Sequence, residues 1–239
     1  MPAALLSAEF EGIVHFKINT GKGSPQEISY STKNSLVRID ILTINDSGPS
    51  VILDAVKKEM IVLLPAQKKY VAQSIAEPRS RLAKPDRTES VLEKTGGTEK
   101  IFGFECDRYV VKSEGYTTEL WLTKQLGAFL GLGFASKSSG PLSTPVPGEA
   151  GSTNTNNANS WETLIAGKNL FPLRVITSHI PGQETSRLEA TGFEKKPLID
   201  SVFAPPDGWE KIDIGTMLRH LLIPPPASPA RPINPGTSA

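Results

Sequence analysis

The chain contains almost no cysteine. Cys106 is the single cysteine among 239 residues, so neither an internal disulfide nor a zinc site made of several thiolates can hold the fold together. The neighbouring carboxylates of Glu105 and Asp107 are expected to raise the pKa of this thiol, which opposes a role as a nucleophile. The fold must therefore be stabilised by the burial of apolar side chains.

An excess of charge and a long apolar run are missing as well. The 26 lysines and arginines are balanced by 25 aspartates and glutamates, so the protein has no strong electrostatic attraction for nucleic acid or for an anionic membrane. No segment approaches the roughly 20 apolar residues that a membrane-spanning helix needs. With 38% hydrophobic residues the chain can bury a large core, and its length fits one all-β domain. No nucleic-acid partner and no integral membrane span are predicted, and nothing in the sequence specifies an oligomeric state.

The usual signatures of enzymes and metal proteins are missing too. The sequence contains no G-x-S-x-G, no P-loop and no complete G-x-G-x-x-G. The histidines His15, His179 and His220 are far apart and show no metal-binding spacing. Asp54 is interpreted as a turn-former rather than as a general base. No catalytic residue, no metal and no cofactor is predicted, because an enzyme would need a convergent set of polar residues that the sequence does not display.

Alternation of apolar and polar residues is the strongest positive feature. Residues 50–73 contain three short β-type runs, and the breaks at 55–58 and 65–68 are too short to hold a helix. This pattern is typical of an antiparallel meander. In residues 9–18 the apolar residues Phe10, Val14, Phe16 and Ile18 fall on even positions, as in a half-buried strand. Further strands are predicted at residues 27–31, 35–42, 51–54, 60–64, 70–73, 91–95, 98–102, 105–112, 117–123, 173–180 and 184–194.

Two apolar segments are candidates for covering this sheet. Residues 124–134 are apolar and glycine-rich, which fits either a loose helix or a loop packed on the sheet, and we favour the helix. Residues 161–169 carry Trp161, Leu164 and Ile165 on one helical face behind Ser160, a good N-cap, so a short amphipathic helix is predicted there. A tryptophan beside such an element either packs into the core or lines a cavity.

The sequence predicts one folded domain over residues 9–222. Within it, residues 74–93 are expected to form a loop or a short helix and residues 215–222 a helix. Residues 137–159 are predicted to be a disordered insertion, because they cannot bury enough surface to offset the entropy of ordering. Residues 223–239 are predicted to be a disordered proline-rich tail. Residues 1–8 are either an ordinary frayed terminus or the remnant of a signal peptide whose start is clipped or misassigned.

Seven short motifs follow one another over most of residues 9–209. They are FEG from Phe10, VRID from Val37, ILD from Ile52, PAQKKY from Pro65, IFGFEC from Ile101, ELW from Glu119 and FAPPDGW from Phe203. In their order and spacing they resemble an exported bacterial family of unknown function. The sheet of this family is expected to resemble that of the lipoprotein carriers LolA and LolB, which is an analogy of fold.

The resemblance implies a mainly β, α+β fold. This is a single strongly curved antiparallel sheet, or half-open β-barrel, with a few short helices over its concave apolar face. It further implies a non-enzymatic protein of the periplasm or cell envelope, which binds a hydrophobic small molecule, a lipid or a lipoprotein acyl chain in the concavity. Without export the protein would be cytoplasmic. The residues expected to line the cavity or its lid are Phe16, Val37, Ile39, Leu63, Leu120, Trp121, Phe129, Trp161 and Leu164.

One alternative stays open. The protein would then be a structural or protein-interaction module whose barrel is filled by its own side chains. The two hypotheses differ in the expected interior, which is an apolar cavity in the first and a solid core in the second.

Overall fold

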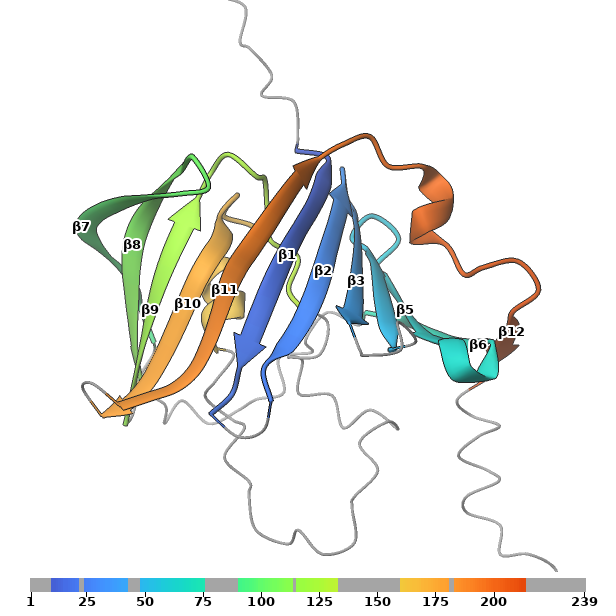
Figure 1. The fold of residues 1–239 in the computed structure, drawn as a ribbon, viewed down its shortest axis with the longest axis horizontal. Helices are drawn as coiled ribbons and strands as arrows, with labels where there is room; N and C mark the ends of the chain where they lie inside the picture. The colour runs from blue at the N-terminus through green and yellow to red at the C-terminus, as the bar shows by residue number, and fades with distance from the viewer. Residues whose placement is uncertain are drawn as a thin grey trace, which may run out of the picture.

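One sheet contains all the strands that the structure describes. The computed structural model describes residues 10–21, 24–42, 48–75, 90–113, 115–132, 160–180 and 183–213. The sheet has twelve strands in the order β12-β6-β5-β4-β3-β2-β1-β11-β10-β9-β8-β7 (Figure 1). Their bounds are β1 Gly12–Asn19, β2 Gln26–Lys33, β3 Leu36–Leu42, β4 Ser50–Asp54, β5 Glu59–Leu64, β6 Lys69–Ser74, β7 Leu92–Ile101, β8 Phe104–Ser113, β9 Tyr116–Thr123, β10 Phe171–Ile180, β11 Gln183–Lys195 and β12 Glu210–Ile212.

The predicted fold class is confirmed, with one difference at the edge. The sheet is a single mainly antiparallel one that does not close into a barrel, and helices are few. Strands β6 and β12 pair in parallel, so the sheet is mixed. Strand β12 has no counterpart among the predicted strands, because three residues are too few to show an alternating pattern.

The predicted meander is confirmed by strands β4, β5 and β6, which are consecutive antiparallel neighbours. Its second corner is the short 3-10 helix η1 (Pro65–Gln67). At its first corner the Asp54 carboxylate accepts hydrogen bonds from the backbone N–H groups of Val56 at 3.0 Å and Lys57 at 2.8 Å. Asp54 therefore shapes a turn, as expected.

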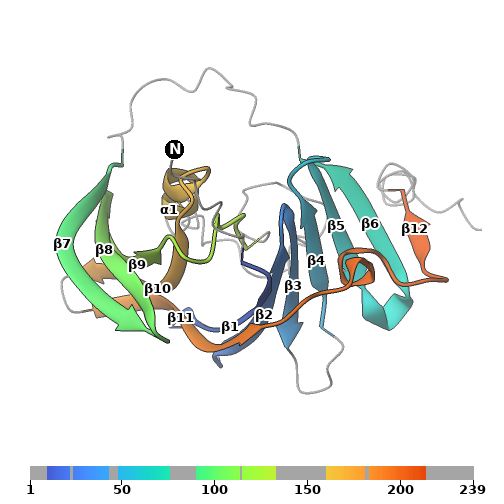
Figure 2. The same ribbon diagram turned by 90° about the horizontal axis from the view of Figure 1, so that it is seen from above.

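The first strand, β1, and the long strand β11 near the C-terminus meet in the middle of the sheet. Strand β1 pairs with β2 on one side and with β11 on the other, so β1 to β6 form one arm and β7 to β11 the other (Figure 1). Figure 2 shows that the sheet is curved and that helix α1 (Ser160–Ile165) lies on its concave side. Apolar side chains that alternate toward this concave side form the main core.

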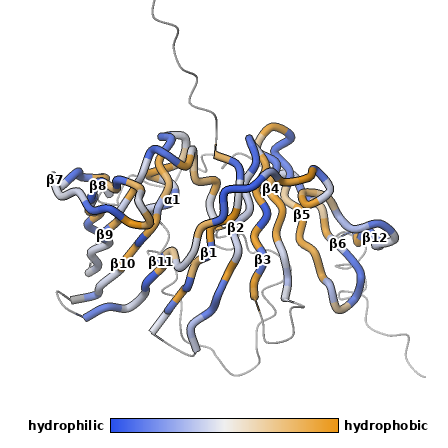
Figure 3. Tube along the Cα trace, turned by 45° about the horizontal axis from the view of Figure 1, so that its top comes forward, coloured by the Kyte–Doolittle hydropathy of each residue, from blue (hydrophilic) through white to orange (hydrophobic). Residues whose placement is uncertain are grey.

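The convex face of the first arm is covered by residues 196–209, here called the C-terminal strap. Lys33 donates a hydrogen bond to the Leu198 carbonyl at 2.6 Å, and Arg38 donates one to the Val202 carbonyl at 3.1 Å. The strap contains a 3-10 helix, η2 (Asp200–Phe203). A second, smaller apolar cluster lies beneath it, formed by Ile52, Leu63, Leu198 and Phe203. Strands of this arm are therefore apolar on both faces, and Figure 3 shows long hydrophobic stretches there, whereas edge strand β7 is mostly hydrophilic.

The short helix at Trp161 is confirmed, whereas the favoured helix over residues 124–134 is wrong for the part that the structure describes. Residues 124–132 form an irregular loop packed against the sheet. Gly127 and Gly131 have φ angles of +80° and +89°, which a right-handed helix does not allow. The alternative prediction for this segment, a loop packed on the sheet, is therefore confirmed for residues 124–132.

Two predicted strands, residues 91–95 and 98–102, form the single strand β7. Its pairing with β8 is interrupted between Lys94 and Thr98, where Gly96 has a φ of +75°. An irregular position with glycine inside one strand has the same sequence pattern as a turn between two strands.

Several predictions lie outside the described residues. They concern residues 1–8, 137–159, 215–222 and 223–239, together with residues 76–89 of the predicted loop. Within the ranges that are described, no helix is long and apolar enough to cross a membrane.

Candidate ligand-binding site

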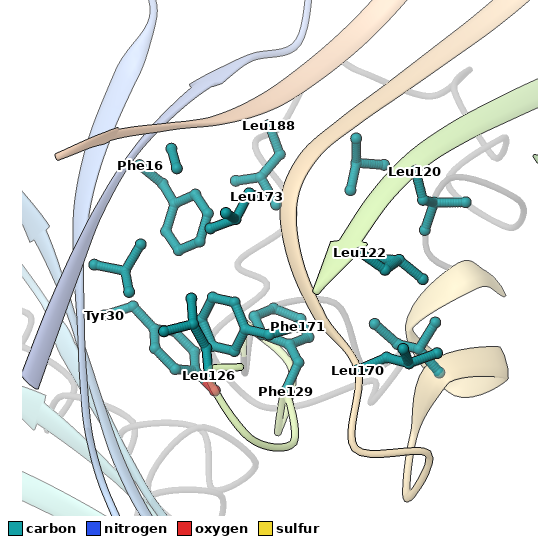
Figure 4. Packing of buried hydrophobic residues seen from close by; sticks show 14 of the residues in the cluster. Phe16, Tyr30, Leu120, Leu122, Leu126, Phe129, Leu170, Phe171, Leu173 and Leu188 are labelled. Atoms are coloured by element: carbon teal, nitrogen blue, oxygen red, sulfur yellow. The ribbon is translucent and has the colours of Figure 1, made fainter. Parts of the chain in front are cut away.

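Four aromatic side chains occupy the centre of the concavity. Tyr30 and Phe16 project from β2 and β1, Phe171 from β10, and Phe129 from the loop opposite (Figure 4). The ring centroids of Tyr30, Phe129 and Phe171 lie 5.3 to 5.5 Å from one another. All four side chains are buried. These four aromatic side chains thus fill the centre of the concavity.

Residues 124–132, here called the cover loop, form the wall opposite the sheet. Leu130 donates its backbone N–H to the Tyr30 hydroxyl at 3.1 Å, and Phe129 donates its own to the Leu170 carbonyl at 3.2 Å. Burial raises the pKa of Tyr30, so the phenol stays neutral while it accepts this bond. At the start of the loop, Gln125 accepts a bond from the Glu105 backbone N–H at 3.1 Å. Single bonds of this kind contribute about 1 kcal/mol each, so apolar packing of Leu126 and Phe129 holds the loop as much as hydrogen bonding does.

Glu162 of helix α1 places a carboxyl group against the same loop. The Leu132 backbone N–H donates a hydrogen bond to this carboxyl, while its Oε1 atom has no hydrogen-bond partner in the described part of the chain. Burial is the main cause that raises the pKa of Glu162 to about 7. The group is therefore protonated in mildly acidic solution.

This carboxyl predicts a dependence of stability on pH. Because its pKa rises from 4.5 to about 7 on folding, the folded state holds the proton more tightly, and stability falls as pH rises from 4.5 to about 7. The loss is complete above that pH and is on the order of 3 kcal/mol. Glu162→Gln should remove this slope and be more stable than the wild type at pH 8. Urea unfolding at pH 5 and pH 8 measures the effect, and an unchanged slope in the variant contradicts the assignment.

Two open pockets meet at Phe10, on the rim of the sheet beside the cover loop. One has a volume of about 400 Å³ and the other of about 560 Å³, which is the size range of small-molecule sites. The rings of Phe10 and Phe193 stack at 4.7 Å, and Phe104 meets Phe193 edge-on, also at 4.7 Å. We call the two pockets together the rim site. Its lining residues are Phe10, Glu11, Thr32, Asn34, Ser35, Ala55, Phe104, Gln125, Leu126, Gly127, Ala128, Leu130, Phe193, Lys195, Lys196 and Pro197.

The FEG motif explains how Phe10 reaches this position. A Cβ atom on Gly12 would contact the Glu194 carbonyl oxygen and come within 2.6 Å of the Phe10 ring, so only glycine lets the ring fold back over the chain. Glu11 accepts a hydrogen bond from the Leu198 backbone N–H at 2.5 Å and lies 3.7 Å from the Lys33 amine. The motif therefore joins the rim site to the C-terminal strap.

Seven of the nine predicted ligand-binding residues come together around the concavity. They are Phe16, Val37, Ile39, Leu120, Phe129, Trp161 and Leu164. The other two point elsewhere. Leu63 lies in the smaller cluster under the strap, and Trp121 alternates with Leu120 and faces the other side of β9, from where it contacts the edge of the main cluster. Leu63 and Trp121 therefore do not line the concavity, and ligand binding by the other seven stays a prediction.

A family model described as domain of unknown function, DUF4412, matches residues 10–209. The chain belongs to this family. The predicted membership in a family of unknown function is thereby confirmed, and the matched range starts at Phe10 and ends at Trp209, the first and last residues of the seven motifs. A search of curated proteins gave no match.

Solved structures similar to this DUF4412 chain include a LolA superfamily protein from Nitrosomonas europaea, with 11% identity, 84% of this chain and 91% of that chain covered, and a TM-score of 0.32. An uncharacterised conserved protein from Thermus thermophilus has 12% identity, covers 87% and 91% of the two chains, and has a TM-score of 0.48. MucB in complex with MucA(peri) has 15% identity, 83% and 55% coverage, and a TM-score of 0.41. A LolA superfamily protein is thus among the similar solved structures.

Other DUF4412 motifs of this chain have structural roles. In VRID, the Arg38 guanidinium pairs with the Asp40 carboxylate at 2.8 Å. In ELW, the Trp121 ring lies between two guanidinium groups, those of Arg108 at 5.6 Å and Arg174 at 5.1 Å. Such cation–π contacts stabilise an exposed sheet face by about 0.5–1 kcal/mol each.

One polar trio outside the concavity resembles a catalytic arrangement. The His15 ring lies 3.0 Å from the Ser29 hydroxyl through Nδ1 and 2.9 Å from the Glu194 carboxylate through Nε2. The three residues lie on neighbouring strands β2, β1 and β11, whose backbone groups pair with one another, so the backbone N–H groups of these strands are not available as an oxyanion hole. We interpret the trio as cross-strand pairs.

Metal and thiol chemistry have no support in the described ranges either. No group of three or more potential metal ligands is found there. Burial is the largest cause that raises the pKa of Cys106 to about 11. The thiol is therefore neutral, as expected, although burial and not the neighbouring carboxylates is the main reason.

Sequence reasoning did not find the rim site. Phe10, Phe104 and Phe193 belong to segments far apart in the chain, and each was assigned only to a motif or to a strand. A correct prediction that β1 pairs with β11 would have placed Phe193 beside the segment that carries Phe10. In that pairing Gly12 lies opposite Lys195 and Val14 lies opposite Phe193.

Proposed function

We propose that this protein binds a hydrophobic ligand, such as a lipid or an acyl chain, without catalysing a reaction. The observation that supports this best is the rim site, where two open pockets, the larger one with an aromatic wall, meet at Phe10 beside the cover loop. Leu126 and Leu130 of the loop line one pocket, and Gln125 lines the other. A bound chain therefore lies along the cover loop and extends into the concavity when the loop moves outward.

The chemistry of the loop suits this movement. Its contacts with the sheet are mainly apolar, and an acyl chain offers the same kind of contact in exchange. The hydrogen bonds from Leu130 to Tyr30 and from Phe129 to Leu170 are few enough for a long chain to offset. At about 0.8 kcal/mol per buried methylene, roughly three methylenes offset these two bonds.

A second candidate function is favoured by the filled centre of the concavity. The aromatic cluster of Phe16, Tyr30, Phe129 and Phe171 is what a structural or protein-interaction module predicts. The two functions differ in whether the rim site accepts a chain.

The place of action that we propose is the periplasm or cell envelope, as the family resemblance implies. Cell fractionation of the full-length gene product, with an antibody against this chain, tests that location. Recovery with the cytoplasmic fraction would contradict it.

A pair of neighbouring substitutions tests the ligand function. The neutral fluorescent probe N-phenyl-1-naphthylamine brightens in apolar sites, and we expect the wild type to bind it with micromolar affinity. Ala55 lines the smaller pocket, so Ala55→Trp should fill much of that space and weaken binding at least tenfold. Val56, its neighbour, is 77% exposed and is not part of the lining, so Val56→Trp serves as the control and should bind like the wild type. A wild type that does not brighten the probe would favour the interaction module.

A further inference from the structure

The larger pocket of the rim site combines an apolar wall with positive charge. Its wall is formed by Phe10, Phe104 and Phe193, and its border carries Lys195, Lys196 and Glu11. The Phe10–Phe193 and Phe104–Phe193 ring contacts fix the wall. The pocket therefore presents an apolar surface next to ionised groups, which is the arrangement that an amphiphile requires.

The ion pairs that these charged groups form determine the net charge that the pocket presents to a ligand. Lys196 pairs with Glu194 at 2.7 Å. Glu11 is engaged by the Leu198 N–H and by Lys33. Lys195 is exposed and forms no ion pair within the described ranges. Among the residues that the structure describes, the Lys195 ammonium group thus stands at the pocket without a paired carboxylate.

The strand geometry directs Lys195 toward the pocket. Lys195 and Phe193 are two residues apart on β11 and share a face of the strand. Glu194, between them, faces the other way and contacts His15. The Lys195 amine and the Phe193 ring can therefore contact the two ends of one ligand.

A hydrogen-bond donor lies at the same border. Gln125 lines the pocket, and its side-chain oxygen accepts the Glu105 N–H at 3.1 Å. This bond fixes the orientation of the amide group, whose nitrogen carries two further N–H donors. A carboxylate needs both a positive charge and N–H donors of this kind.

We propose that the rim site takes a long-chain fatty acid, with its acyl chain against Phe10, Phe104 and Phe193 and its carboxylate at Lys195. The proposal rests on the proposed function, because it assumes that the rim site accepts an acyl chain. It adds the class of ligand, a single-chain anionic amphiphile. The buried chain supplies most of the affinity, and the charge of the head group supplies specificity.

The test compares ligands that share a chain and differ in charge. N-phenyl-1-naphthylamine is bound to the full chain and displaced with dodecanoate or with dodecyltrimethylammonium, both below their micelle concentrations. We expect dodecanoate to displace the probe at a concentration at least fivefold lower, and we expect salt to reduce the difference through screening. Dodecyl phosphate, a second anion, shows whether the site distinguishes carboxylate from phosphate, and tighter binding of the phosphate would overturn the fatty-acid assignment.

Two variants assign the preference to Lys195. Lys195→Gln should weaken dodecanoate about fivefold, as for the loss of one exposed ion pair, and should affect the uncharged probe less than dodecanoate. The control is Lys17→Gln, which removes the same charge from an exposed position of β1 that does not line the pocket. Equal displacement by the two amphiphiles, or an unchanged preference in Lys195→Gln, overturns this inference alone. A wild type that does not bind the probe overturns the proposed function as well.

Discussion

Phe171→Ala should lower the free energy of unfolding by about 3–5 kcal/mol, the cost of truncating a fully packed aromatic core residue. Phe171 is completely buried and its ring contacts those of Phe16, Tyr30 and Phe129. It is also where β10 meets the cover loop, because Phe129 donates its N–H to the carbonyl of the preceding residue, Leu170. Urea unfolding, followed by tryptophan fluorescence, measures the change.

The control for this truncation is another phenylalanine of the same chain. Phe102 lies in the turn between β7 and β8 and is 52% exposed. Phe102→Ala should change the free energy of unfolding by less than about 1 kcal/mol. Similar losses in the two variants would mean that the aromatic cluster is not the centre of the core.

Gly12→Ala is expected to have the second largest effect, about 3 kcal/mol of lost stability. The added methyl group would contact the Glu194 carbonyl oxygen in the paired strand and lie 2.6 Å from the Phe10 ring. The clash with the carbonyl strains the β1–β11 pairing, and the clash with the ring displaces Phe10 from its position. The variant should therefore lose binding of N-phenyl-1-naphthylamine even under conditions where it is folded.

Gly97→Ala is the matched control. Its new methyl group would meet the Arg108 side chain at an ordinary contact distance of 3.6 Å. Stability should change by less than about 0.5 kcal/mol and probe binding should not change. Normal stability and normal probe binding in Gly12→Ala would show that Phe10 is not fixed by this motif.

Alternation predicted most of the strands because the two faces of a half-buried strand appear in the sequence with period two. That rule also sets its limit. Strand β5, EMIVLL, is apolar throughout after Glu59 because the C-terminal strap covers the second face. The strap consists of residues 196–209, which are far from β5 in the sequence. The residues around Leu63 therefore do not indicate which face of the sheet its side chain occupies.

The cover loop shows a different limit. An apolar, glycine-rich stretch such as residues 124–134 fits a helix and a packed loop equally well by composition. Whether the segment is a helix or a loop depends on the residues that Leu126, Phe129 and Leu130 contact. Their partners include Tyr30, Trp161 and Leu170, which lie far from the loop in the sequence. The rim site escaped prediction for the same reason, since Phe10, Phe104 and Phe193 meet only after strands β1, β11, β10, β9 and β8 have paired.

The placement of a bound chain at the rim site is tested most directly by amide NMR spectra of the labelled protein during titration with dodecanoate. The account predicts that the largest shifts of amide signals fall on Gly127, Ala128 and Leu130 of the cover loop and on Phe193 and Lys195. The amide signals of Ser50 and Leu63, which line a separate pocket next to the strap, should not shift. Shifts centred on the strap, or none at all, would contradict the claim that an acyl chain binds at the rim of the concave face.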